Sequence, residues 1–261
     1  NMAQQGLFGD VMHAEGAYIH DLRSYNYDTT ATGYKNMWRL KAQKEEAGNP
    51  YPTHGLGPVA QILNIHRGDR MATLVSMSNA QKGMHLYAAE HDIAGEDTAR
   101  IDMGDMNTTL IRTAKGKTIM IQHDVTSPRP YNRIHMVSGT KGFAQKYPLT
   151  GIALEPNAHE FVSQQTLDSL LKVYEHPFCK EIGEKARKVG GHGGMDFIMD
   201  YRLIHCLKNG LPLDMDVYDA AEWSCLVELT DYSVRNGSVP VQIPDFTRGE
   251  WDKLQGLTFA E

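Results

Sequence analysis

The 261-residue chain has little of what several common protein classes require. It contains three cysteines, Cys179, Cys206 and Cys225, which lie far apart and form no CxxC pair. A disulfide framework or a thiolate zinc site is therefore not expected, and each thiol is expected to be a small buried apolar group. No apolar run approaches the roughly 20 residues that a membrane helix requires, and residues 1–6 lack the apolar core of a signal peptide.

An excess of positive charge is also missing. The chain has 26 Lys and Arg against 32 Asp and Glu, a net charge of −6, and the two signs are interspersed. A basic surface for nucleic acid and a polybasic membrane patch are therefore not predicted. We expect neither nucleic acid nor a membrane among the partners.

Familiar catalytic motifs are absent as well. No GxSxG occurs, and the twelve histidines form no HxxxH or HxH pair, so neither a serine nucleophile nor a metal site is predicted. The glycine-rich segment 189–196 (VGGHGGMD) lacks the Lys-Ser/Thr of a phosphate-binding loop, and a charged, helix-like stretch precedes it instead of an apolar strand. We interpret it as a flexible connection between two helices, in which His192 could still line a cleft.

A stiff polar loop occupies residues 49–58 (NPYPTHGLGP). Its two prolines fix φ, and its two glycines permit turns that other residues resist. Apolar residues then recur at helical spacing, so Tyr51 and His54 are expected just before or within the first turn of a helix, where the positive helix end favours anionic or hydroxyl-rich ligands. From physics alone, a rigid connector with a buried, satisfied histidine is an equally good interpretation.

The ionisable groups of this loop are a phenol and an imidazole. It holds no Asp or Glu, so the two-carboxylate chemistry of most glycosidases cannot be located in it. A phenol with a pKa of about 10 and an imidazole with a pKa of about 6.5 suit proton transfer at a sugar hydroxyl or at an acidified C–H. Tyr131, in the segment SPRPYNR at 127–133, is likewise held by proline, although ring packing at a sheet edge would explain it equally well.

The chain pattern predicts strands followed by helices. Tyr18 and His20 share one face of the first strand, and the strands are interpreted as an antiparallel meander in one broad sheet. A piece at 240–244 is extended and suited to an edge. The predicted strands cover residues 11–21, 70–77, 107–113, 117–125, 133–138 and 142–147, and the predicted helices cover 34–46, two or three segments of 157–189, 193–207 and a last helix capped by Asp216.

The beginning of the chain has the character of a helix end. Residues 2–10 read as a last helical turn closed by Gly6 and followed directly by a strand. No earlier element accounts for such a turn. We therefore expect that an amino-terminal portion precedes this sequence in the intact protein.

Several segments together resemble glycoside hydrolase family 109: EGAYIHDLR at 15–23, WRL at 38–40, the loop at 49–58, the dipeptide at 130–131 and GHGGMD at 191–196. The resemblance spans nearly the whole chain. This family belongs to the Gfo/Idh/MocA oxidoreductase-like superfamily. The resemblance implies an α+β fold in which an open, mostly antiparallel sheet has helices packed on one face. Residues 1–261 would then be the C-terminal, substrate-binding domain of a two-domain protein whose NAD-binding Rossmann domain is absent from this chain.

The resemblance also implies an activity, that of an α-N-acetylgalactosaminidase with NAD as a recycled redox agent. Transient oxidation of the sugar at C3 acidifies the C2 proton, elimination expels the group at C1, water adds, and re-reduction restores C3. The implied substrate is a glycoside with terminal N-acetylgalactosamine, and export of the full-length protein to the periplasm or the exterior is compatible with the family. Two alternatives are a sugar oxidoreductase on the same scaffold and a non-catalytic domain that binds sugar or self-associates through its sheet.

Carried over position by position, the resemblance implies a set of substrate-contacting residues. His54 would assist removal of the C3 hydroxyl proton, and Tyr18 or Tyr51 would handle the C2 proton. Arg39 would orient hydroxyls or the acetamido carbonyl. No metal ligand is implied, and without the cofactor's principal binding residues this chain alone is expected to be inactive. The full set is Tyr18, Arg39, Tyr51, Pro52, Thr53, His54 and Tyr131.

Overall fold

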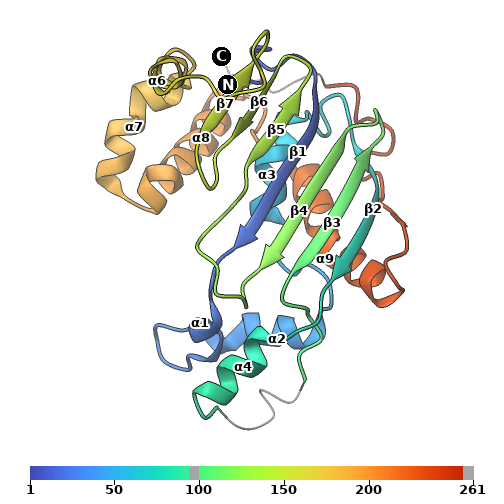
Figure 1. The fold of residues 1–261 in the computed structure, drawn as a ribbon. Coiled ribbons are helices and arrows are strands. Elements are labelled where there is room, and N and C mark those ends of the chain that lie inside the picture. Colours follow the sequence, from blue (N-terminus) through green and yellow to red (C-terminus); the bar gives the residue numbers. More distant parts are fainter. Residues whose placement is uncertain (94–99, 255–261) are drawn as a thin grey trace.

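The computed structural model describes residues 1–93 and 100–254. Its centre is an eight-stranded sheet with the strand order β7-β6-β5-β1-β4-β3-β2-β8. Figure 1 shows this sheet as one broad, open layer. The strands are β1 (Val11–Ile19), β2 (Met71–Ser78), β3 (Asn107–Thr113), β4 (Thr118–Asp124), β5 (Met136–Gly139), β6 (Gly142–Gln145), β7 (Gly151–Leu154) and β8 (Val241–Gln242).

The first strand lies in the middle of the sheet. Neighbouring strands run antiparallel except β1 and β4, which are parallel, so the predicted open and mostly antiparallel sheet is confirmed. The expected uninterrupted meander is wrong, because β1 separates the hairpin β3–β4 from the hairpin β5–β6. The reason is burial: the last four residues of β1 are all buried, and such a strand needs neighbours on both sides.

The helices occupy one face and two ends of the sheet. In Figure 1, α3 and α9 pass behind the strands, while α1, α2 and α4 gather at one end and α6, α7 and α8 lie beyond β7. Helices on one face were predicted, but β7, α1 and α4 were not, because such short elements carry little periodicity. The helices are α1 (Arg23–Tyr27), α2 (Trp38–Glu45), α3 (Thr53–Ile62), α4 (Gly83–Glu90), α6 (Gln164–Val173), α7 (Pro177–Val189), α8 (Met195–Asn209) and α9 (Val217–Arg235), with 3-10 turns η1 (Lys35–Met37) and η2 (His192–Gly194).

The main core lies between the sheet and the pair α3 and α9. Leu56 and Val59 of α3 and Leu226 of α9 are fully buried against sheet residues such as Ile119 and Ile121. Each such side chain contributes about 1.5–3 kcal/mol by leaving water. Since α3 follows directly on the loop at 49–58, this packing fixes the position of that loop.

Several local predictions can be compared directly with the structure. The turn closed by Gly6 is present, since Leu7 N donates to Met2 O and Gly6 N donates to Ala3 O. Asp216 caps α9 as expected, through a capping box. Cys179, expected to be buried, is exposed on α7, because this helix has a solvent-facing side. Within the described residues, no helix combines the length and apolar character that crossing a membrane would require.

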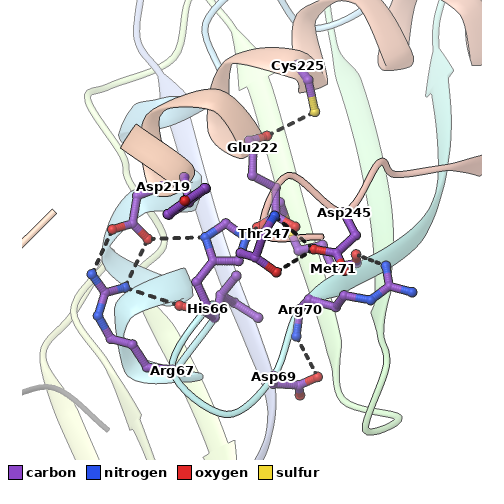
Figure 2. Close-up of polar contacts among 12 residues, drawn as sticks. His66, Arg67, Asp69, Arg70, Met71, Asp219, Glu222, Cys225, Asp245 and Thr247 are labelled. Atoms are coloured by element: carbon purple, nitrogen blue, oxygen red, sulfur yellow. Dashed lines mark hydrogen bonds and ion pairs between the residues drawn. The ribbon is translucent and has the colours of Figure 1, made fainter. Parts of the chain in front are cut away.

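A buried ionic cluster ties α9 to the loop that follows α3 (Figure 2). Arg67 donates to both oxygens of Asp219 at 3.0 and 2.8 Å, and His66 Nε2 lies 3.0 Å from Glu222 Oε2. Burial raises the pKa of Glu222, whereas the carboxylate of Glu222 raises the pKa of His66 against the effect of burial. His66, Asp216 and Asp219 could together reach a metal ion. Because Arg67 already neutralises Asp219, we interpret the cluster as an ion pair that fastens the helix.

Weakening this buried pair should cost more stability than breaking an exposed pair of similar length. Asp219→Asn keeps one acceptor for Arg67 but removes the charge, and we expect the free energy of unfolding to fall by about 2 kcal/mol. The exposed pair Lys188–Glu184 has a 2.7 Å contact, and Glu184→Ala should cost about 0.5 kcal/mol or less. Urea unfolding of the two variants measures the difference. Equal losses would contradict this account of the cluster.

Candidate active site

Three of the predicted residues meet at one end of the sheet. Tyr18 lies at the end of β1, His54 in the first turn of α3, and Tyr51 in the loop just before this helix. The Tyr18 ring centroid lies 4.9 Å from that of Tyr51 and 4.9 Å from that of His54, and the Tyr51 and His54 centroids are 4.4 Å apart. The expected placement of Tyr51 and His54 around the start of a helix is confirmed.

Hydrogen bonds hold the loop at 49–58 in place. The backbone N–H of Asn49 donates to Thr230 Oγ1 on α9, and the side chain of Asn49 accepts from the N–H of Tyr51, both at 2.9 Å. Pro52 is buried and precedes the first residue of α3, Thr53, which is half-buried. These two residues therefore shape the loop and the positive end of the helix beside the three rings.

Two glycines bring the strand and the helix together. Gly16 of β1 and Gly55 of α3 face each other with no side chain between them. A Cβ at Gly16 would overlap the carbonyl oxygen of Gly55 and lie 2.6 Å from its carbon. This backbone contact sets the distance between Tyr18, two residues after Gly16, and His54, the neighbour of Gly55.

Arg39 of α2 lies within an aromatic box. Its guanidinium carbon is 5.5 Å from the ring centroid of Tyr18 and 4.9 Å from that of Tyr51. Trp38 and Tyr34 complete the box at 4.6 and 4.9 Å. Such contacts stabilise a cation, more so where water is excluded. Arg39 is only 2% exposed, and its Nε and Nη1 have no hydrogen-bond partner among the residues that the structure describes.

A second wall comes from the connection between β4 and β5. Tyr131 is exposed, and its ring centroid lies 5.3 Å from that of His20. Arg133 donates through Nε to the hydroxyl of Tyr131, and its guanidinium carbon lies 5.8 Å from the Tyr18 centroid. The structure therefore places Tyr131 at the rim of the site, in contact with His20 and Arg133.

Burial and positive charge keep the site's histidines neutral. Burial lowers the pKa of His54 to about 4, and Arg133, Arg39, His192 and His20 add to the effect. The pKa of His20 is lowered by burial and by the same two arginines. With its pKa at about 4, the imidazole of His54 is a free base at neutral pH.

Burial also raises the pKa of Tyr18, and the phenols of Tyr34 and Tyr51 act in the same direction. The charges of Arg39 and Arg133 oppose this rise. A tyrosine between two guanidinium groups can donate a proton in its neutral state, and its anion is favoured by the flanking charges. The arrangement as a whole can bind a hydroxyl-rich ligand against aromatic faces and move protons without a carboxylate.

Four residues of the site were not predicted from the sequence. Tyr34 and Trp38 join through the box around Arg39, and Arg133 joins beside Tyr131. His123 of β4 pairs in register with Tyr18, stacks on it with a centroid distance of 6.1 Å, and has a pKa lowered by burial to about 3. The proline-rich segment 127–133 was the available signal for Arg133, whereas His123 requires knowledge that β1 and β4 are neighbours.

The glycine-rich segment has the predicted role of a helix connection. Residues 190–194 join α7 to α8, and their four glycines adopt positive φ. His192 Nδ1 lies 2.9 Å from Asp196 Oδ2. Because the charge of His192 contributes to lowering the pKa of His54, this exposed histidine belongs to the surroundings of the site.

Comparison with known proteins fits this geometry. The sequence profile described as "Glycosyl hydrolase 109, C-terminal domain" matches residues 1–253. An "Alpha-N-acetylgalactosaminidase" of Bacteroides fragilis is 59% identical over 256 residues, covering 97% of this chain and 60% of the relative. A "Glycosyl hydrolase family 109 protein" of Porphyromonas gingivalis is 52% identical, covering 100% of this chain and 57% of the relative. The chain thus spans about 60% of the length of such relatives.

Solved structures share the fold at low identity. Levoglucosan dehydrogenase in complex with NADH and L-sorbose superposes with a TM-score of 0.62 at 15% identity, covering 94% of this chain and 62% of that protein. Scyllo-inositol dehydrogenase of Lactobacillus casei gives a TM-score of 0.53 at 10% identity, with coverages of 93% and 59%. The match of nearly the whole chain to the family profile is decisive, and the chain belongs to glycosyl hydrolase family 109.

Proposed function

We propose that this chain forms the substrate-binding part of an NAD-dependent α-N-acetylgalactosaminidase. The observation that carries the proposal is the cluster of Tyr18, Tyr51 and His54 beside Arg39, which combines aromatic faces with groups that transfer protons. The relative named "Alpha-N-acetylgalactosaminidase" supports N-acetylgalactosamine as the sugar and its α-glycosidic bond as the bond that is cleaved. Terminal N-acetylgalactosamine on a glycoside is the proposed substrate.

The donor set of the site fits a redox cofactor. Phenols and neutral imidazoles move protons but accept no hydride, so a reaction that begins with oxidation of a sugar carbon needs a separate acceptor. NAD, when bound, supplies that reversible hydride acceptance. Levoglucosan dehydrogenase, which has the same fold, has been solved in complex with NADH. We propose that a Rossmann domain in the part of the relatives that this chain does not span holds the nucleotide, and that His54 and Tyr51 face the reacting sugar.

Each residue of this chain then has a defined task. His54, neutral because of its low pKa, accepts the proton of the C3 hydroxyl. Tyr18 or Tyr51 handles the C2 proton once C3 is a ketone. As a base the tyrosine acts from its phenolate, which at Tyr18 the charges of Arg39 and Arg133 favour against the effect of burial. Arg39 donates hydrogen bonds to sugar oxygens through its unpartnered N–H groups, while Pro52 and Thr53 fix the loop.

A sugar oxidoreductase is the second candidate, favoured by the dehydrogenases among the solved structures of this fold. The two functions differ in what accumulates. The glycosidase returns its hydride in every cycle, whereas the oxidoreductase releases a keto-sugar and reduces added NAD in equal amounts.

Hydrolysis in heavy water by the NAD-loaded full-length enzyme separates these candidates. With 4-nitrophenyl α-N-acetylgalactosaminide we expect free sugar that carries deuterium at C2, and no net NADH. Mass spectrometry of the product and absorbance at the NADH band measure both quantities. Stoichiometric NADH with a keto-sugar would establish the oxidoreductase instead, and product without deuterium at C2 would exclude the elimination route. The chain alone should be inactive.

The open face of the sheet is the proposed site of self-association. Figure 1 shows no helix in front of β2, β3 and β4. Leu110 and Met77 on this face are exposed, and Leu110 pairs in register with Met120 and Val75. We expect Leu110→Glu to shift a dimer toward the monomer in analytical ultracentrifugation, because it places a charge in the apolar row. Leu207→Glu, at an exposed leucine of α8, serves as the control. An unchanged sedimentation coefficient of the Leu110 variant would refute this interface.

A further inference from the structure

Two guanidinium groups approach the same tyrosine from different parts of the chain. Arg39 comes from α2 and Arg133 from the connection between β4 and β5. Their guanidinium carbons lie 5.5 and 5.8 Å from the Tyr18 ring centroid. Both charges therefore act on the space beside Tyr18, where the sugar is proposed to bind.

Neither cation has a carboxylate partner in the described residues. Within residues 1–93 and 100–254, Arg39 is buried with the N–H groups of Nε and Nη1 unpartnered, and the Arg133 side chain donates a hydrogen bond to the neutral phenol of Tyr131. Several arginines outside the site are paired with acids, for example Arg67 with Asp219. Arg202 with Asp214 is another such pair.

Placing cations without counter-charge beside buried rings costs stability. Such a loss of stability is typical of functional sites, where an unpaired charge interacts with a ligand or with a transition state. Because Arg39 is nearly enclosed by rings, only a small negatively charged group can reach it. The proposed substrate itself is neutral, so this charge has to arise during the reaction.

The proposed reaction develops negative charge at one identifiable atom. With C3 oxidised to a ketone, the base takes the proton from C2. The electron pair of the C2–H bond becomes the C2=C3 double bond, and the carbonyl π pair moves onto O3. The enolate then collapses: the pair on O3 re-forms the carbonyl, and the pair of the C2=C3 bond becomes a C1=C2 bond. The leaving group departs with the electron pair of its bond to C1.

Building on the proposed function, we propose that Arg39 and Arg133 together stabilise the negative charge on O3 during removal of the C2 proton. Arg133 thereby becomes a further catalytic residue of this site. Tyr131 orients it, since its hydroxyl accepts the hydrogen bond from Arg133 Nε. The lowered pKa of His54, to which both arginines contribute, is a second consequence of the same pair of charges.

The test compares Arg133→Met and Arg133→Lys in the NAD-loaded full-length enzyme. Arg129→Met is the matched control, because Arg129 lies on the same connection but faces Asp124 at 3.8 Å. Removing a donor to an oxyanion typically costs a factor of about 100 or more. We expect Arg133→Met to lower both kcat and the rate of deuterium exchange at C2 about 100-fold, with KM changed by no more than about threefold. Arg133→Lys should recover part of the rate.

The outcomes separate the inference from the function it builds on. If the wild-type enzyme exchanges no deuterium at C2, the proposed function fails. If the wild type exchanges and Arg133→Met behaves like Arg129→Met, the role of Arg133 is overturned. A raised KM with unchanged kcat would also overturn it, because the arginine would then bind the ground state or a permanent anion on the substrate.

A second readout needs no cofactor. In this chain alone, NMR titration of the imidazoles should show the pKa of His54 moving upward from about 4 in Arg133→Met and staying in place in Arg129→Met. Dispersed amide signals would confirm that each variant is folded. An unchanged pKa of His54 in folded Arg133→Met would show that this charge does not reach the site.

Discussion

Replacing His54 by alanine is expected to lower kcat of the full-length enzyme by a factor of about 10²–10⁴, the usual contribution of a positioned acid–base group. The binding of NAD should be unaffected, because the residue acts on the sugar hydroxyl. Steady-state hydrolysis and the amount of NAD retained after gel filtration measure the two effects. His159→Ala, a histidine in the connection after β7, is the control that should leave both unchanged.

The pH dependence of the wild type follows from the same residue. The pKa of His54 lies at about 4, below the ordinary value of 6.5, because burial and nearby cations disfavour its charged form. The imidazole is thus a free base throughout the neutral range and becomes protonated only as the pH falls through about 4. On the acidic side, kcat/KM should decline there and not near pH 6.5. Near-normal turnover of His54→Ala, or a decline centred near pH 6.5, would show that another group is the base.

Much of this site could be predicted because its signals are local. The loop at 49–58 combines prolines, glycines and a following apolar period within ten residues, and these fix both the loop and the start of α3. Alternation along β1 was enough to place Tyr18 and His20 on one face. The resemblance to the family added Arg39 and Tyr131, which no local pattern could connect with the loop.

The remaining parts depend on contacts between distant segments. The insertion of β1 between β4 and β5 brings His123 beside Tyr18 and Arg133 close to Tyr18. An antiparallel meander, however, is equally consistent with the same alternation of residues along the strands. The order of the strands depends on which faces of the sheet are buried in the folded protein. This cannot be determined from a single sequence. The aromatic box around Arg39 was not predicted for a similar reason. Tyr34, which forms part of it, lies before α2 begins, and tertiary packing fixes its position.

The glycine contact between β1 and α3 connects the motif at 15–23 with the geometry of the site. Valine fits a strand better than glycine, so local propensity alone predicts that Gly16→Val stabilises the chain. The structure predicts the reverse, since a Cβ at Gly16 overlaps the backbone of Gly55, and a Cβ at Gly55 would likewise lie 2.7 Å from Ala17 N. Neither backbone can yield without moving α3, and with it His54, away from Tyr18.

We therefore expect Gly16→Val to lower the free energy of unfolding by about 3 kcal/mol or more and kcat by about 100-fold, as for reacting groups displaced by about 1 Å. Urea unfolding of the chain and hydrolysis by the full-length enzyme give the two numbers. Gly183→Ala is the matched control, because its nearest neighbour atoms lie at 3.9 and 4.0 Å within α7, and it should be neutral or slightly stabilising. A Gly16→Val enzyme with normal stability and turnover would show that the separation of β1 and α3 does not control the site.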